Sequence, residues 1–139
     1  MEVNSKPILI IDDDSDDREF ILEAWKELSF PNHLIFFKSG EEVLKYLKNE
    51  KVIPFLILSD VNLPKMNGFE LKEKLLKEKD TRYASIPFVF WSSAISNTQV
   101  QKAYDLGVNG IFIKENNFNS LKAVLIDIMN YWEKSKVPE

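Results

Sequence analysis

The chain has 139 residues, 45% of them hydrophobic, which suits a single domain with a core of its own. Its formal net charge of −4 argues against nucleic acid as a partner, and the absence of cysteine excludes disulfides and thiolate metal sites. Residues 1–6 are polar and short for a signal peptide, and no apolar run approaches the ~20 residues of a membrane span. We therefore expect a cytoplasmic protein with no membrane partner.

Short apolar runs alternate with amphipathic stretches along the chain, and each run predicts a strand that is followed by a helix. In chain order the expected elements are a strand at Pro7–Asp12, a helix that begins at Asp14 or Ser15 and is ended by Pro31, a strand at Leu34–Phe37, a helix capped by Ser39, a strand at Phe55–Asp60, a helix opened by Asn67, a strand at Pro87–Ser92, a helix over Ser96–Leu106 that ends at Gly107, a strand at Ile111–Lys114 and a helix around 121–132. The charged segment Lys77–Ile86 is expected to be a surface connection.

This alternation predicts the fold class. Strands joined through helices favour a parallel sheet with right-handed crossovers and helices on both faces. The apolar runs lack in–out alternation, as expected of strands that are covered on both sides. We predict an α/β fold with a doubly wound, five-stranded parallel sheet.

Polar side chains follow four of the predicted strands directly. They are the acidic run Asp12-Asp13-Asp14, the lone Asp60, the hydroxyl of Ser92 and the amine of Lys114. Because the carboxyl ends of parallel strands meet at one edge, where open α/β sheets bind ligands, we expect these groups to lie together.

The chemistry of this set favours phosphoryl transfer. Carboxylates about 5 Å apart repel by roughly 3 kcal/mol at an effective dielectric near 20, and Mg²⁺, which prefers oxygen ligands, removes that cost. Asp12 and Asp13 suit the metal pair, whereas Asp60 stands alone at its strand end and suits a phosphoryl acceptor. Lys114 can neutralise the transferring group, and Ser92 can donate a hydrogen bond to it.

Several motifs together resemble the response regulator receiver domain over about residues 7–133. Ile10 to Asp14 resembles the strand and acidic pair of that family, and Leu58 to Gly68, which reads LSDVNLPKMNG, resembles its phosphoacceptor strand and loop. Ile86 to Ala94 resembles the strand that ends in a switch hydroxyl, and Leu106 to Lys114 resembles the strand that ends in the family lysine. The resemblance implies a flavodoxin-like (βα)5 fold with strand order 2-1-3-4-5.

The resemblance also implies roles for the site residues. Asp60 would accept a phosphoryl group from a histidine kinase or phosphotransfer protein. Asp13, Asp60 and the backbone carbonyl of Asn62 would bind Mg²⁺ directly, and Asp12 would reach the metal mainly through water. The chain would be a signalling phosphoacceptor and not an enzyme that acts on other molecules.

The same resemblance also implies how the signal leaves the domain. Ser92 and Lys114 would hold the phosphoryl oxygens and shift the fourth strand and helix. The chain is expected to be one receiver domain over 1–139 with no output domain, so the signal must leave by protein contact. The helix at 96–106, the strand at 111–114 and the helix at 121–132 would form the contact face for an unknown output protein or for a homodimer, with aromatic anchors at Tyr104, Phe118 and Tyr131.

Two positions depart from the family pattern. Glu115 stands where the family usually has proline, so we expect a trans bond after Lys114, since a cis bond to a residue other than proline costs about 3–4 kcal/mol. Ile111 stands where many members carry the aromatic ring that rotates with the switch hydroxyl. We therefore expect the output surface to respond through backbone shifts in residues 92–110.

Other functions stay open on the sequence alone. Glu115 and Ile111 favour an interaction module that is not phosphorylated. Asp12-x-Asp14 also resembles the nucleophile motif of haloacid-dehalogenase-type phosphatases, in which Asp12 would be the nucleophile. A calcium loop starting at Asp12 lacks its glycine, which is replaced by Asp17, and a flavin site would need a less acidic loop after the first strand.

Overall fold

The protein is described here by a computed structural model of residues 6–138; residues 1–5, most of the polar segment discussed above, lie outside the described part. Five strands are present, β1 (Ile8–Ile11), β2 (Leu34–Phe37), β3 (Leu56–Ser59), β4 (Phe88–Ser92) and β5 (Gly110–Ile113). Five α-helices follow them in turn, α1 (Ser15–Lys26), α2 (Gly40–Glu50), α3 (Gly68–Lys77), α4 (Asn97–Asp105) and α5 (Phe118–Lys134). The predicted βα alternation is confirmed.

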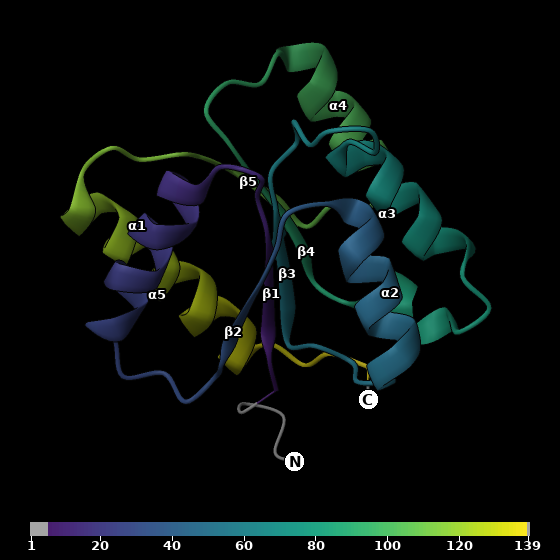
Figure 1. The fold of residues 1–139 in the computed structure, drawn as a ribbon, viewed down its shortest axis with the longest axis horizontal. Helices are drawn as coiled ribbons and strands as arrows, with labels where there is room; N and C mark the ends of the chain where they lie inside the picture. Colours follow the sequence, from purple (N-terminus) through teal and green to yellow (C-terminus); the bar gives the residue numbers. More distant parts are fainter. Residues whose placement is uncertain (1–5, 139) are drawn as a thin grey trace.

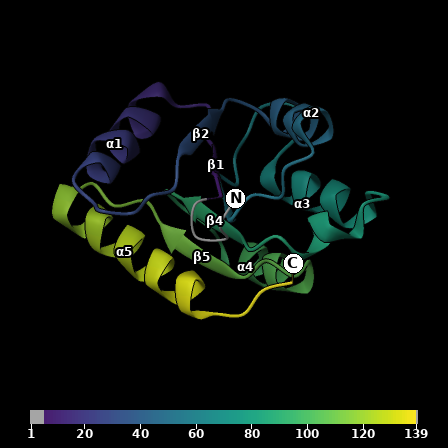
Figure 2. The same ribbon diagram turned by 90° about the horizontal axis from the view of Figure 1, so that it is seen from below.

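The strands form one parallel sheet in the order β2-β1-β3-β4-β5, as expected. Helices α1 and α5 pack together on one face, and α2, α3 and α4 cover the other (Figures 1 and 2). The chain passes from β1 outward to β2 and then back across to β3, so the strand order reverses beside β1. The loops at the carboxyl ends of β1 and β3 therefore flank the crevice at which such sheets bind ligands.

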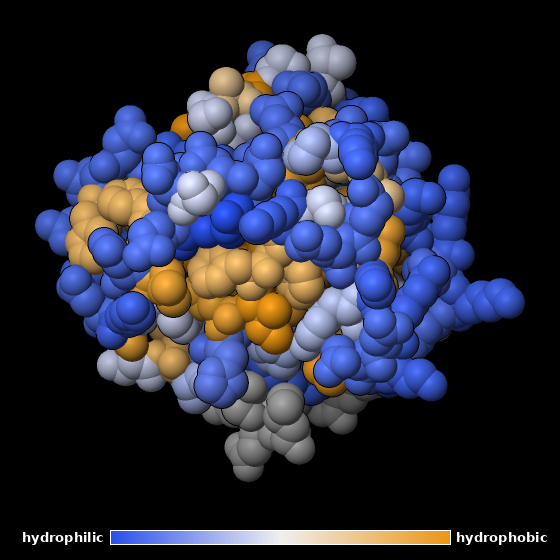
Figure 3. All heavy atoms as spheres, viewed as in Figure 1, coloured by the Kyte–Doolittle hydropathy of each residue, from blue (hydrophilic) through white to orange (hydrophobic). Residues whose placement is uncertain are grey.

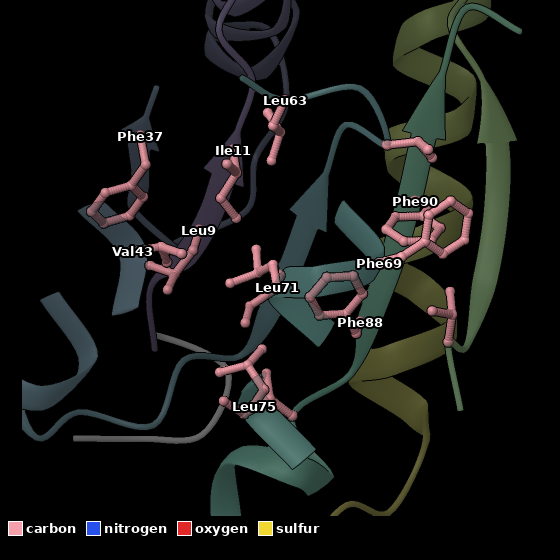
Figure 4. Packing of buried hydrophobic residues seen from close by; sticks show 14 of the residues in the cluster. Leu9, Ile11, Phe37, Val43, Leu63, Phe69, Leu71, Leu75, Phe88 and Phe90 are labelled. Atoms are coloured by element: carbon pink, nitrogen blue, oxygen red, sulfur yellow. The ribbon is translucent and has the colours of Figure 1, made fainter. Parts of the chain in front are cut away.

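Each face of the sheet has its own apolar core because neighbouring residues of a strand point to opposite faces. Leu9 and Ile11 of β1 join a cluster with Phe88 and Phe90 of β4 under α2 and α3, part of which is shown in Figure 4. The other cluster lies under α1 and α5 and contains Ile8, Ile10, Val89, Trp91, Leu121 and Leu125. Two filled layers hold the central strands rigidly, which fixes the residues at their ends.

Local signals explain where the helices begin and end. Asp14 is the N-cap of α1, and its side chain accepts hydrogen bonds from two backbone N–H groups of the first turn. Ser96 and Gln99 form a capping box at α4. Gly107 follows α4 with φ of 81°, the left-handed conformation in which glycine is favoured. Helix α1 ends at Lys26, several residues before Pro31.

The segment Lys77–Ile86 is not the simple surface connection that we predicted. It contains a 3-10 helix, η2 (Thr81–Ser85), whose Tyr83 side chain is 6% exposed. The Tyr83 hydroxyl donates a hydrogen bond of 2.8 Å to the carbonyl of Leu47 in α2. Because Tyr83 lies among charged residues in the sequence, its buried position was not predicted.

The edge strand β2 is less covered than the central strands. Leu34, Ile35 and Phe36 are half-buried, and apolar atoms reach the surface in the middle of the face shown in Figure 3. None of the helices within residues 6–138 is both long and apolar enough to cross a membrane.

Candidate functional site

The predicted site residues gather at the carboxyl edge of the sheet because backbone hydrogen bonds align the strand ends. The N–H of Asp12 donates to the carbonyl of Phe37 (3.0 Å), and the N–H of Asp60 donates to the carbonyl of Ile11 (2.8 Å). The N–H of Lys114 donates to the carbonyl of Ser92 (2.8 Å). A hollow opens at this edge, and its lining includes Asp13, Asp17, Asp60, Trp91, Ser93 and Lys114.

Three carboxylates meet at this edge of the sheet. One oxygen each from Asp12, Asp13 and Asp60 lies within 4.8 Å of the others. Asp12 and Asp60 are buried, whereas Asp13 is exposed at the mouth of the hollow. A set of oxygen donors at this separation fits a hard divalent cation, which can bind one or two carboxylates and keep several waters.

Asp60 has one carboxylate oxygen on each side of the site. Its Oδ1 accepts a hydrogen bond of 3.1 Å from the backbone N–H of Asn62, and its Oδ2 lies 2.8 Å from Nζ of Lys114. Burial raises the pKa of the Asp60 carboxyl and outweighs the opposing effect of the Lys114 hydrogen bond. Gly68 is required behind it, because a Cβ there would lie 2.7 Å from the backbone oxygen of Asp60.

Lys114 is the fixed cation of the site. Its side chain is 12% exposed, and its Nζ lies 2.7 Å from Asp17, 2.8 Å from Asp60 and 3.0 Å from Asp12. Burial lowers the pKa of Lys114, but the hydrogen bonds to Asp17, Asp60 and Asp12 together outweigh it, so the net pKa is raised. The ammonium therefore stays charged at neutral pH. No peptide bond within residues 6–138 is cis, as expected for the bond that follows Lys114.

Asp12 is fully buried and held on both of its oxygens. Its Oδ1 accepts the backbone N–H of Asp14 (3.0 Å), and its Oδ2 accepts the indole N–H of Trp91 (3.0 Å) as well as Lys114. Arg18 donates to the Asp12 carbonyl at 2.7 Å, which ties α1 to the end of β1. These contacts fix the orientation of the Asp12 carboxylate, which, unlike that of Asp60, does not line the hollow.

Ser92 is at the predicted strand end, but its hydroxyl does not join the carboxylates here. Ser92 is fully buried, and its Oγ donates a hydrogen bond of 2.8 Å to the carbonyl of Ala94. The neighbouring Ser93 is exposed and lines the hollow. The role expected for Ser92 stays a prediction, and it requires the hydroxyl to exchange its bond with Ala94 for one with the phosphoryl group.

Sequence reasoning missed two contributors. No sequence pattern assigned Asp17 to the site, yet it makes the shortest of the three contacts with Lys114, from 97 residues away in the chain. No pattern in the sequence predicts that the indole N–H of Trp91 meets Asp12. For Asp17 a signal existed, since the first turn of the helix after β1 lies at the same sheet edge as Lys114.

Comparison with known proteins agrees with this geometry. The family description of the response regulator receiver domain matches residues 8–126. The probable methanogenesis regulatory protein FilR2 of Methanothrix harundinacea is 28% identical over 129 residues, which cover 90% of this chain and 82% of that protein. Response regulator Rcp1 of Synechocystis is 27% identical over 132 residues, with 91% and 88% covered.

Solved structures give the same result. The phosphorylated cyanobacterial phytochrome response regulator RcpA superposes with a TM-score of 0.85 at 28% identity and covers 97% of this chain and 99% of its own. The Mn²⁺-bound form of response regulator Rcp1 gives a TM-score of 0.81 at 28% identity, with 96% and 99% covered. With its sheet order, its acidic edge and these matches, the chain belongs to the response regulator receiver domain family, whose members are phosphoacceptor signalling modules of two-component systems.

Proposed function

We propose that this chain is a phosphorylation-dependent receiver whose phosphoryl acceptor is Asp60. The phosphoryl group comes from a histidine kinase or phosphotransfer protein. The observation that carries the proposal is the environment of the Asp60 carboxylate. It lines an open hollow, one of its oxygens faces Lys114 at 2.8 Å, and it shares the edge with Asp12 and Asp13. An acceptor needs this combination of access for the donor and nearby positive charge.

In the proposed transfer one bond to phosphorus forms and one breaks. A carboxylate oxygen of Asp60 forms the new O–P bond, the P–N bond of the donor phosphohistidine breaks, and its electron pair stays on the imidazole nitrogen. Lys114 lies where it can neutralise charge on the phosphoryl oxygens. The buried Asp12 keeps Lys114 oriented, and Trp91 keeps Asp12 oriented, by the 3.0 Å bonds described above.

Mg²⁺ is the proposed cofactor. Asp13 and Asp60 would bind it directly with the Asn62 carbonyl, and Asp12 mainly through water. The three oxygen donors within 4.8 Å of one another suit a hard cation, and the Mn²⁺-bound form of the Rcp1 relative supports the proposal. When bound, the ion would supply charge neutralisation at the transferring phosphoryl group.

Output is proposed to pass through a protein contact on the α4-β5-α5 face, in the cytoplasm, with a separate output protein or a second copy. Four of the five exposed large apolar side chains among residues 6–138 support this face: Tyr104, Ile113, Ile126 and Tyr131. Phe118, expected as a further anchor, instead packs edge-on against Phe20 of α1 with ring centroids 5.8 Å apart.

The test is intact-protein mass spectrometry after incubation with acetyl phosphate and Mg²⁺. One added phosphoryl mass is expected on the wild type, none without Mg²⁺ and none on Asp60→Asn. If acetyl phosphate, a phosphorylated histidine donor and beryllofluoride all fail with the wild type, the proposal is wrong and an unphosphorylated interaction module takes its place.

A turnover assay with phosphate esters separates the phosphatase alternative. A phosphatase that used Asp12 would turn over phosphate esters, lose that turnover on Asp12→Asn and keep it on Asp60→Asn. Asp12 is fully buried and, unlike Asp60, does not line the hollow, which argues against this outcome.

A further inference from the structure

The ammonium of Lys114 is engaged by three acids, with hydrogen bonds to Asp17 and Asp60 and an ion pair to Asp12. A lysine ammonium has three N–H donors and no acceptor. Three different carboxylate oxygens lie within reach, those of Asp17 at 2.7 Å, Asp60 at 2.8 Å and Asp12 at 3.0 Å. Any phosphoryl oxygen that Lys114 is to bind must therefore compete with these three partners.

The three acids differ in what else they do. Asp12 and Asp60 belong to the carboxylate group that suits a metal, and Asp60 is also the proposed acceptor. Asp17 is neither a member of that carboxylate group nor the proposed acceptor. It lies in the first turn of α1 with a side chain 33% exposed, and its backbone N–H is held by the N-cap Asp14 at 3.2 Å. Its contact with Lys114 is the shortest of the three.

We propose that Asp17 is a positioning residue for the transfer, acting through Lys114. It anchors the ammonium over the site while the bond to Asp60 is exchanged for a bond to the phosphoryl group. Without this anchor Asp12 alone would hold the long, flexible lysine stem once the bond to Asp60 is exchanged, and ordering the stem would cost more side-chain entropy. The inference rests on the proposed function, since it assigns a role within the same site.

A carboxylate near the site also has effects that need no contact with Lys114. Its charge attracts Mg²⁺ and repels an anionic phosphoryl donor. Asp16 offers a matched control, because it lies in the same turn of α1, lines the same hollow and carries the same charge. Asp16 is exposed and makes no ion pair within residues 6–138. The difference between Asp17→Asn and Asp16→Asn therefore isolates the contact.

The first measurement is the rate of labelling by acetyl phosphate at saturating Mg²⁺, followed by intact mass. Asp17→Asn is expected to be labelled about 10-fold more slowly than Asp16→Asn. Equal rates, or faster labelling of Asp17→Asn, would overturn the inference, because the acid would then be a bystander or a competitor for the lysine. Matching thermal unfolding of the two variants excludes a folding defect.

The second measurement is the Mg²⁺ affinity, followed by the indole N–H resonance of Trp91. With Lys114 present, Asp17→Asn is expected to weaken Mg²⁺ binding about threefold more than Asp16→Asn. The reason is that the lysine, no longer held by Asp17, competes with Mg²⁺ for the carboxylates of Asp12 and Asp60. In a Lys114→Met background the two substitutions should agree. A difference that persists there would refute action through Lys114. If Mg²⁺ binds as expected but the wild type cannot be labelled by any donor, it is the proposed function that fails.

Discussion

Replacing Asp13 by asparagine tests the charge balance of the site most directly. Asp13 has an oxygen within 4.8 Å of one from Asp12 and one from Asp60, and it is the exposed member of the three. At this separation two unit charges repel by about 1 kcal/mol at the dielectric of water, which is the suitable limit for an exposed group. Removing both repulsions should raise the free energy of unfolding without metal by about 1–2 kcal/mol, or roughly 3–6 °C in Tm.

The same substitution removes a proposed ligand of Mg²⁺, so its effect should reverse when the metal is added. The wild type should gain about 1.4 kcal/mol at a Mg²⁺ concentration ten times its Kd, because the ion binds the folded state. Asp13→Asn should gain little over the same range. Thermal unfolding with EDTA and with increasing Mg²⁺, followed by circular dichroism, measures both effects.

Asp16→Asn is the control, since it changes the net charge equally but lies outside the three-carboxylate group. It should stabilise the metal-free protein less than Asp13→Asn and keep the Mg²⁺ response. If the two variants have the same stability without metal, repulsion within the group is too weak to matter. If both respond to Mg²⁺ as the wild type does, the ion binds elsewhere.

Three further predictions concern the scaffold. Gly68→Ala should destabilise the protein by about 1–3 kcal/mol in a urea titration and slow phosphoryl labelling, because the new Cβ would lie 2.7 Å from a backbone oxygen at the end of β3 and from a ring of β4. Gly40→Ala should cost less in the same titration, because its Cβ would meet a flexible methionine sulfur. Tyr83→Phe should cost about 1 kcal/mol by removing the buried hydrogen bond to α2, whereas Tyr104→Phe at an exposed position should leave the urea midpoint unchanged. Burial lowers the pKa of Lys72, which is 2% exposed. The free energy of unfolding should therefore rise as the pH increases from the lowered pKa toward the ordinary one, because the unfolded state then binds more protons. Lys72→Met should flatten that rise in an unfolding series from pH 7 to 10.5.

The order of apolar runs and breakers was enough to predict the fold class and the position of the site edge, whereas the strand order was predicted from the family resemblance. A strand ended by Asp60 and a strand ended by Lys114 must bring both groups to one edge if the strands are parallel, and the alternation with helices requires that they are. Here Asp60 and Lys114 are 2.8 Å apart. Helix caps such as Ser39 could also be predicted, since they depend on residues three apart in the chain.

Side-chain partners could not be predicted in this way, because they depend on how each element is rotated about its axis. The sequence offers Asp16 and Asp17 as equal candidates, and only the packing of α1 against the sheet turns Asp17 toward Lys114. Ser92 and Ser93 likewise differ only in which side of the strand end they face, and the tertiary structure buries one and exposes the other. Chain order thus determined which groups share the sheet edge, whereas close packing of the helices decided which of them touch.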